Sequence, residues 1–289
     1  MSTLLSWLAR YESILLLGAV GAYLAATIVF WGHLFFQSNS LAGAPDEAAT
    51  RSQKIGRVLL IVGLTLHGLA LLGEGEVLFA VRAGVASLFG FALVLVYLLA
   101  GARLGGATPG AFVTPVALLA SLYALAAPPL HTTTPPQQLE SRWLMIHVSI
   151  TLIGYVALAF AFAAAVTYLV QEGLLKRKKL TGLWRKLPSL QVADGWIYRA
   201  TSFGLAMLTL GLSTGLMWQL WARPEYSVWR DPKVLVSLAT WLTFALYLAA
   251  RWWLGWRGRR SNLVVVCGFV LLVISFLGTP HILPAVSGR

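Results

Sequence analysis

Long apolar runs dominate the sequence, and polar positions interrupt them at intervals that suit a series of membrane helices. Each run is close to the roughly 20 residues that a helix needs to cross about 30 Å of hydrocarbon. Strict alternation of apolar and polar positions, which β-barrel strands would show, does not occur. The runs predict eight membrane-spanning helices, at about residues 12–36, 56–72, 77–100, 110–127, 143–170, 196–220, 234–254 and 263–283.

The composition agrees with this class. The chain is 58% hydrophobic and 11% charged, and its mean hydropathy is +0.76, which is typical of a polytopic membrane protein. We therefore expect an all-α helix bundle in contact with the lipid bilayer. Glu74 and Glu76 separate the second and third spans so narrowly that these spans should form a close antiparallel hairpin. No soluble domain is separable, so residues 1–289 are expected to form one integral membrane domain.

The net charge of +12 gathers in alternate loops. By the positive-inside rule these loops face the cytoplasm, which places both termini outside. A nucleic-acid partner is not expected, because the sequence has no soluble basic face. The first span is longer than the core of a signal peptide and should be retained, in a cell inner or plasma membrane. The basic cytoplasmic loop at residues 171–195 contains Lys176, Arg177, Lys178, Lys179, Arg185 and Lys186.

Four of the five histidines fall near the predicted outer face. His67 lies near the outer end of the second span, His131 precedes the fifth span, His147 is one turn into the fifth span, and His281 ends the eighth. A histidine inside an apolar helix is costly unless a partner, water or metal satisfies it. For His67, metal ligation and a helix–helix hydrogen bond are both open. For His131, ligation competes with an ordinary exposed loop position.

A tryptophan-rich outer loop, residues 221–233, joins the sixth and seventh spans. Tryptophan often anchors helices at a membrane interface, and that role is one alternative here. Flat indoles can also pack on a porphyrin, and arginine can bind the propionate carboxylates. The loop and the helix turn before it therefore predict a haem-binding platform, made of Trp218, Trp221, Arg223, Trp229, Arg230 and Asp231.

His147 and His281 flank this loop from two helix ends, and two imidazoles on opposite faces of a porphyrin give a six-coordinate iron. We predict these two residues as the axial ligands of haem. Zinc is disfavoured, because neither a cysteine pair nor a close histidine pair is present. Cys267 is the single cysteine, so covalent haem attachment to this chain is not expected. The expected cofactor is b-type haem, bound non-covalently.

The same segments resemble a known family. The stretch 143–148, followed by Gly154 and Tyr155, resembles the histidine helix of cytochrome c assembly proteins of the CcsA/ResC type. Residues 215–247 resemble the tryptophan-rich WWD loop of that family and the helix after it. Residues 276–281 are placed like the second external histidine of the family. The resemblance covers roughly residues 57–283.

In that family, haem is held at the outer membrane face between two external histidines and the tryptophan loop, and is presented to the CxxCH motif of an apocytochrome c. The resemblance implies His147 and His281 as axial ligands, with Trp221, Trp229 and Asp231 in the platform. It also implies apocytochrome c and a second cytochrome-assembly membrane subunit as partners. Whether the chain acts as part of a haem lyase enzyme is left open, because the loop offers few acid–base groups and catalysis would rest on positioning.

The loop departs from the family pattern at Arg230 and Val234, and Ala249 stands where the family often has a histidine. With these departures, with His67 and with the basic segment 256–260, the chain also resembles the HemX/YpjD-like branch of the same superfamily. The alternative function is therefore a membrane regulator of tetrapyrrole synthesis. A small-molecule or haem transporter ranks lower, because the spans carry few of the polar midplane groups that transport requires.

Overall fold

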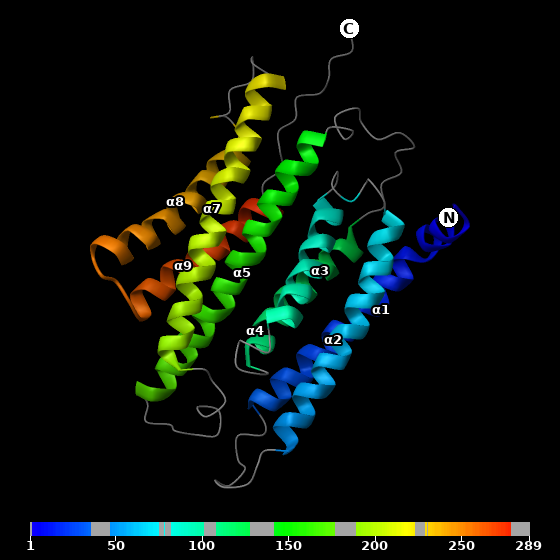
Figure 1. Ribbon diagram of the computed structural model, residues 1–289, viewed down its shortest axis with the longest axis horizontal. Helices are drawn as coiled ribbons and strands as arrows, with labels where there is room; N and C mark the ends of the chain where they lie inside the picture. Colours follow the sequence, from blue (N-terminus) through cyan, green and yellow to red (C-terminus); the bar gives the residue numbers. More distant parts are fainter. Residues whose placement is uncertain are drawn as a thin grey trace. The chain divides into compact units, whose positions relative to one another are not determined.

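The computed structural model describes residues 2–35, 47–74, 78, 82–100, 108–127, 142–176, 189–222, 229 and 231–278 (Figure 1). These residues contain helices and no strand, which confirms the all-α prediction. Each predicted span overlaps one helix. The helices are α1 Ser2–Phe35, α2 Glu47–Glu74, α3 Arg82–Ala100, α4 Thr108–Ala126, α5 Arg142–Lys176, α7 Leu190–Ala222, α8 Pro232–Trp253 and α9 Arg259–Val273, which continues as the π-helical turn η5 Ile274–Gly278.

Six of these helices, namely α1, α2, α5, α7, α8 and α9 with η5, are long and apolar enough to cross a membrane. α3 and α4 are apolar but shorter. Large apolar side chains are exposed along the outward faces of the helices, for example Leu17, Ile28 and Leu246. Such faces suit lipid rather than water. The chain is therefore a multi-pass membrane protein, while the predicted outward orientation of its termini stays a prediction.

Several helices reach beyond the predicted spans. α5 continues to Lys176 and α7 begins at Leu190, so both extend into the predicted basic loop of residues 171–195. α1 begins at Ser2, and α2 begins at Glu47. A hydrophobic run marks the part of a helix that lies in lipid, whereas the backbone hydrogen bonds of the helix can continue into the polar flanks.

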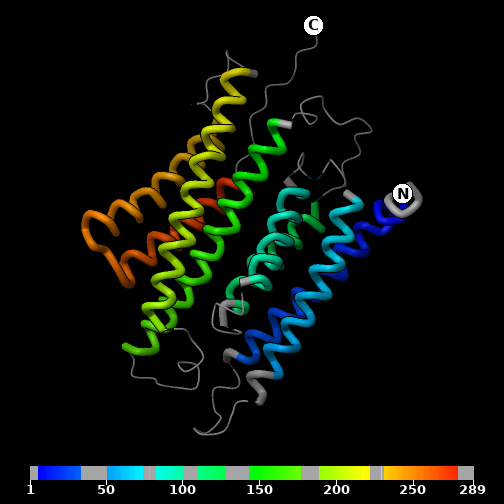
Figure 2. The backbone as a smooth tube through the Cα atoms, viewed as in Figure 1, coloured from blue at the N-terminus to red at the C-terminus, as the bar shows by residue number. Residues whose placement is uncertain are grey.

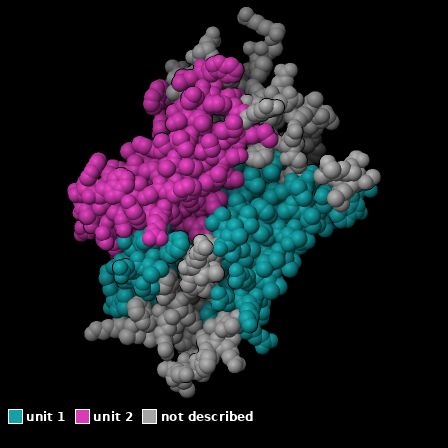
Figure 3. All heavy atoms as spheres, viewed as in Figure 1, with its two compact units in different colours: residues 1–142, 163–197 teal, residues 143–162, 198–289 magenta. Residues whose placement is uncertain are grey.

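The chain divides into two compact units, which Figure 3 shows in separate colours. Unit 1 comprises Met1–Arg142 and Ala163–Ile197, and unit 2 comprises Trp143–Phe162 and Tyr198–Arg289. α5 and α7 thus contribute to both. Whether the whole chain acts as one membrane domain, as the sequence predicts, stays a prediction.

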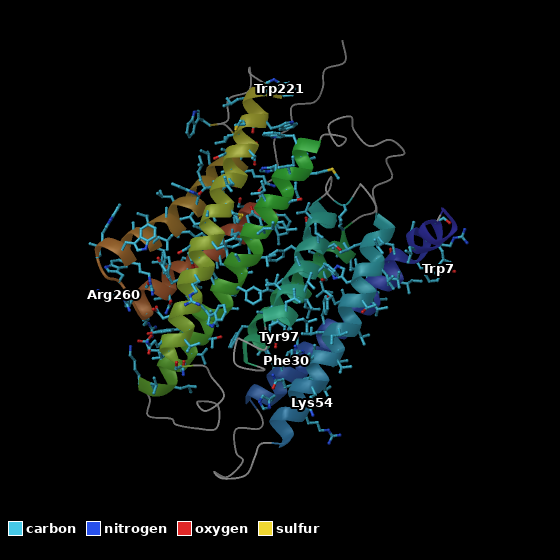
Figure 4. The ribbon with its side chains drawn as sticks, in the orientation of Figure 1. Trp7, Phe30, Lys54, Tyr97, Trp221 and Arg260 are labelled. Carbon is cyan, nitrogen blue, oxygen red and sulfur yellow. The ribbon has the colours of Figure 1, made fainter. Side chains whose placement is uncertain are left out.

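In unit 1, α1 packs along α2 through small residues. The aromatic rings of Tyr23 and Phe30 lie where a Cβ on Gly63 or Gly56 would stand, so the glycines admit the rings between the helices. Phe30 also meets Tyr97 of α3 edge to face, with ring centroids 6.2 Å apart (Figure 4).

The predicted hairpin of the second and third spans is confirmed. Arg57 of α2 donates to the carbonyl of Leu98, and further along α2 His67 bonds to Ser87 of α3. From the first bond to the second, the position on α2 rises from 57 to 67 while the position on α3 falls from 98 to 87. The two helices are therefore antiparallel neighbours.

In unit 2, α8 lies antiparallel to both α7 and α9, and Figure 2 traces the turn that joins α8 to α9. Trp241 and Trp252 of α8 donate hydrogen bonds to Thr209 and Tyr198 of α7. The bonds are eleven residues apart on each helix, which fixes the register. On the other side of α8, Ser237 bonds to Ser275, and Phe244 packs against Gly268 seven residues further along. These contacts show which residues of α7, α8 and α9 lie at the same height along the helices.

Candidate functional site

His147 is held in unit 2 by a contact between α5 and α7. Its Nδ1 lies 2.9 Å from the carbonyl oxygen of Gly211 and 3.3 Å from the hydroxyl of Thr214. A carbonyl oxygen can only accept a hydrogen bond, so Nδ1 carries the hydrogen and donates this bond. The neutral imidazole then has its lone pair on Nε2, which is the arrangement of a metal-ligating histidine whose other nitrogen is oriented by the protein.

Glycines allow α5 and α7 to approach this closely. A Cβ on Gly215 would stand 2.7 Å from Cε1 of His147, so the imidazole lies directly on the α7 backbone. Gly211 faces the hydroxyl of Thr151 at a similarly short range, and a Cβ on Gly154 would be 3.2 Å from the carbonyl oxygen of Gly204. The spacing of Gly211 and Gly215 matches the small-xxx-small pattern of close-packed membrane helices. This spacing is a sequence signal for the partner of His147 that hydrophobic periodicity does not show.

Trp143 is a further residue of this site that the predicted platform omits. Its indole Nε1 donates a hydrogen bond of 3.0 Å to the carbonyl oxygen of Thr214. Trp143 precedes His147 by one helical turn, so the two side chains share a face of α5 and both bond to α7. The Trp143–Thr214 bond therefore fixes the end of α5 that carries His147.

Trp218 and Trp221 extend the same side of α7 past His147. Gly211, Gly215 and Trp218 are four and three residues apart, a spacing that places them on one helix face. Trp221 stands in the last turn of α7 with 85% of its surface exposed (Figure 4). An indole this exposed makes almost no packing contribution within the described residues, so its surface is available to a flat ligand.

Trp229 and Asp231 lie just before α8. Trp229 is 68% exposed, whereas Asp231 is buried. The Asp231 carboxylate accepts a hydrogen bond of 2.8 Å from the backbone N–H of Lys233, and Pro232 takes the first helical position. Asp231 is therefore the N-cap of α8, a role for which aspartate followed by proline is well suited. The acidic residue predicted in the platform thus fixes the end of the loop that carries Trp229.

His131, Arg223, Arg230 and His281 lie outside the described residues. The helix that leads to His281 does run toward the His147 end of unit 2. Phe276 in η5 packs edge to face on Tyr155 of α5, with ring centroids 6.0 Å apart. A π-helical turn is rare and frequently occurs at functional sites.

His67 occupies a different environment in unit 1. It is fully buried, its Nδ1 lies 3.2 Å from the Tyr23 hydroxyl, and its Nε2 lies 2.9 Å from the Ser87 hydroxyl. Phe91 packs edge to face on the same ring. Both nitrogens thus have protein partners, an arrangement that matches the helix–helix hydrogen bond considered for this residue.

The chain matches a known protein family over most of its length. The family model described as cytochrome C assembly protein matches residues 21–284, which include α5, α7, α8 and α9. The chain belongs to the cytochrome c assembly protein family. The match includes His147, the tryptophan segment and His281, the three elements on which the resemblance in the sequence was based. The predicted family is confirmed.

Relatives of this family member carry the name cytochrome c biogenesis protein CcsA. The protein of Guillardia theta is 34% identical over 187 residues, which cover 58% of this chain and 62% of the relative. That of Mesostigma viride is 30% identical over 192 residues, covering 58% and 63%. That of Chlamydomonas reinhardtii is 32% identical, covering 58% of this chain and 47% of the relative. The chain thus spans less than two thirds of the length of these relatives.

A solved structure shares the fold. The cytochrome c haem lyase CcmF superposes with a TM-score of 0.64 at 17% identity, over 93% of this chain and 47% of the CcmF chain. At this identity the likeness shows a common helical arrangement. It supports the fold of the family assignment independently of the sequence matches.

Proposed function

We propose that this protein binds haem at the end of unit 2 formed by His147 and Trp221, and presents it to apocytochrome c during c-type cytochrome biogenesis. The observation that carries the proposal is the bond from His147 Nδ1–H to the Gly211 carbonyl. That bond orients the ring and leaves the lone pair on Nε2, as axial ligation of haem iron requires. The relatives named as cytochrome c biogenesis proteins favour this role over a regulator or a transporter.

The chain's own residues fit a flat, iron-containing, partly anionic cargo. His147 supplies the imidazole, and Trp218 and Trp221 supply flat apolar surface on the adjoining side of α7. In the proposal, His281 is the second axial ligand, and Arg223 and Arg230 bind the propionates. Asp231 acts by capping α8, which holds Trp229 near the other end of the loop. The haem is b-type and non-covalent in this protein before it is transferred.

The contribution of the protein is positioning rather than acid–base catalysis. The imidazoles of His147 and His281 would hold the iron, and the indoles would exclude water from the porphyrin, so the ring would be presented in one orientation to the incoming thiols. A second cytochrome-assembly membrane subunit would hold the apocytochrome. The site would lie at the outer face of the inner or plasma membrane.

Visible absorption spectra of the detergent-purified full chain test the haem site. The oxidised and dithionite-reduced wild type should show a bis-histidine spectrum, which His147→Ala and His281→Ala should lose or convert to high spin. Ile146→Ala is the matched control, because Ile146 neighbours His147 on α5 but is exposed and apolar. A wild type that takes up no haem when haem is supplied contradicts the proposal.

A second experiment tests the role. Co-expression with a CxxCH-containing apocytochrome c and the cognate assembly subunit should yield covalently haem-stained cytochrome. His147→Ala should abolish that stain and Ile146→Ala should not. If haem binds but cytochrome maturation is unaffected by His147→Ala, the regulator of tetrapyrrole synthesis is the better assignment.

A further inference from the structure

The turn between α8 and α9, residues 254–258, lies at the end of unit 2 away from Trp221. Two hydrogen bonds fix its backbone, because the N–H groups of Leu254 and Trp256 both donate to the carbonyl of Ala250, at 3.1 Å each. Gly255 and Gly258 have φ of 63° and 75°, which glycine adopts without strain. Figure 4 marks this turn by the label on Arg260.

A hydrogen bond and a cation–π contact attach the turn to α7. The Trp252 indole donates to the Tyr198 hydroxyl at 3.1 Å, and the Arg251 guanidinium carbon stands 4.9 Å from the centroid of the Tyr198 ring. The geometry of the turn is therefore fixed by its neighbours as well as by its own glycines.

Around this turn, apolar side chains and cations are exposed together. Trp253 is 82% exposed, and Leu254 is 67% exposed. Arg257, Arg259 and Arg260 are exposed too, and no aspartate or glutamate follows Asp231 in the sequence. The charged residues of the turn and of the first turn of α9 are thus all cationic. The exposed apolar side chains beside them suit the interface between acyl chains and headgroups.

Two buried polar residues follow the cations in the first turns of α9. Asn262 is completely buried, yet neither its Oδ1 nor its Nδ2 has a hydrogen-bond partner among the described residues, and the same holds for Oγ of buried Ser261. A buried polar group without a partner costs free energy and calls for an explanation such as a ligand. Side chains on a helix tilt toward its N-terminus, so both groups are directed toward the start of α9.

The start of α9 itself lacks a side-chain cap. Its N-cap residue is Gly258, and the first backbone N–H that finds a helical acceptor is that of Asn262, which bonds to the Gly258 carbonyl. The N–H groups of the preceding turn point out of the helix, where anions bind favourably. The registers of α8 with α7 and α9 bring Thr201 to this same level, and its hydroxyl is also buried and without a partner in the described residues.

We propose that the N-terminus of α9, with Arg257, Arg259, Arg260, Ser261 and Asn262, binds the headgroup phosphate of an anionic phospholipid. The acyl chains lie along Trp253 and Leu254. A lipid fits better than a soluble phosphate, because the cations adjoin exposed apolar side chains at the end of two membrane helices. Haem fits less well, because residues 198–280 contain no histidine to bind its iron.

The test uses the delipidated full-length protein in detergent and its thermal unfolding midpoint. Phosphatidylglycerol should raise the midpoint, whereas phosphatidylcholine with the same acyl chains and inorganic phosphate should not. Arg259→Gln and Arg260→Gln should weaken the phosphatidylglycerol affinity by about fivefold each. The matched control is the pair Arg51→Gln and Lys54→Gln, which removes the same charge from an exposed part of α2 and should leave the affinity unchanged.

Asn262→Ala gives an independent test, because it should change stability without lipid and stabilisation by lipid in opposite directions. Without lipid, this variant should unfold at the same or a higher temperature than the wild type, because it removes a buried amide that has no partner within the described part of the chain. With phosphatidylglycerol it should gain less stability than the wild type. The proposal is overturned if phosphatidylcholine or inorganic phosphate stabilises equally well, if the α2 pair matters as much as the arginines of α9, or if Asn262→Ala keeps the full lipid effect.

Discussion

The imidazole of His147 lies on Gly215 so closely that a Cβ at that glycine would be 2.7 Å from Cε1 and 3.1 Å from Nδ1 of the histidine. The ring is therefore held between the Gly211 carbonyl, which accepts its hydrogen bond, and the backbone of Gly215, where a side chain would not fit. In the proposed function, this contact decides where the ligating nitrogen stands. The same contact offers a way to displace the histidine without replacing it.

Gly215→Ala should push the His147 ring off α7 and break its bond to the Gly211 carbonyl. Loss of such an orienting contact lowers metal affinity by about 10- to 100-fold. The added methyl should cost about 1–3 kcal/mol of stability through overpacking. Haem titration followed in the visible spectrum measures the first effect, and thermal unfolding measures the second.

The matched control for this change is Gly195→Ala on the same helix. A Cβ at Gly195 meets nothing within 4 Å, and the substitution should raise helix stability by up to about 1 kcal/mol. Haem affinity should stay at the wild-type value. Equal haem loss in both variants would mean that α7 is sensitive to alanine in general, and that the His147 contact has no special role.

Trp221→Ala should weaken haem binding by about two- to tenfold, the energy of one aromatic stacking contact. It should leave stability within about 0.5 kcal/mol, because the indole is exposed. Trp253→Ala is the matched control, since Trp253 is 82% exposed against 85% for Trp221 but lies at the other end of unit 2. Haem titration of the two variants compares two similarly exposed indoles at opposite ends of unit 2. An equal loss of haem affinity in both variants would count against a platform at Trp221.

The positions of the eight helices could be predicted because hydrophobic runs report directly on lipid contact, and six of these helices are long and apolar enough to cross a membrane. The partners of His147 could not, because hydrophobicity does not fix the register of one helix against another. The glycine pair at 211 and 215 holds that information, since small residues mark where backbones meet. The lack of a partner for Asn262 among the described residues could not be anticipated either, because hydrogen-bond satisfaction depends on neighbours distant in sequence.

The role of Asp231 also could not be decided from the sequence. The residue types suggested an acidic member of a haem platform, whereas the structure shows the carboxylate bonded to the N–H of Lys233. An aspartate before a proline is also a helix-start signal, and both roles leave the same trace in the sequence. The two roles are separable by experiment.

Asp231→Ala should destabilise the protein by about 1 kcal/mol through loss of the N-cap of α8. Asp231→Asn keeps an acceptor oxygen, so it should retain most of that stability and bind haem as the wild type does. Chemical or thermal unfolding with parallel haem titration distinguishes the roles. If Asp231→Asn is stable but binds haem poorly, the negative charge itself contributes to the platform.

His67→Ala should destabilise unit 1 and leave the haem spectrum unchanged, because both ring nitrogens already bond to Tyr23 and Ser87. Removing these two buried hydrogen bonds should cost about 1–3 kcal/mol. A double-mutant cycle of His67→Ala with Ser87→Ala should give a coupling energy of about 0.6 kcal/mol and at most about 1.7 kcal/mol, the mean and the maximum for hydrogen bonds between membrane helices. Thermal unfolding of the four proteins measures the coupling. Loss of haem absorbance in His67→Ala, with His147 intact, would instead place a second haem at His67, as the sequence allowed.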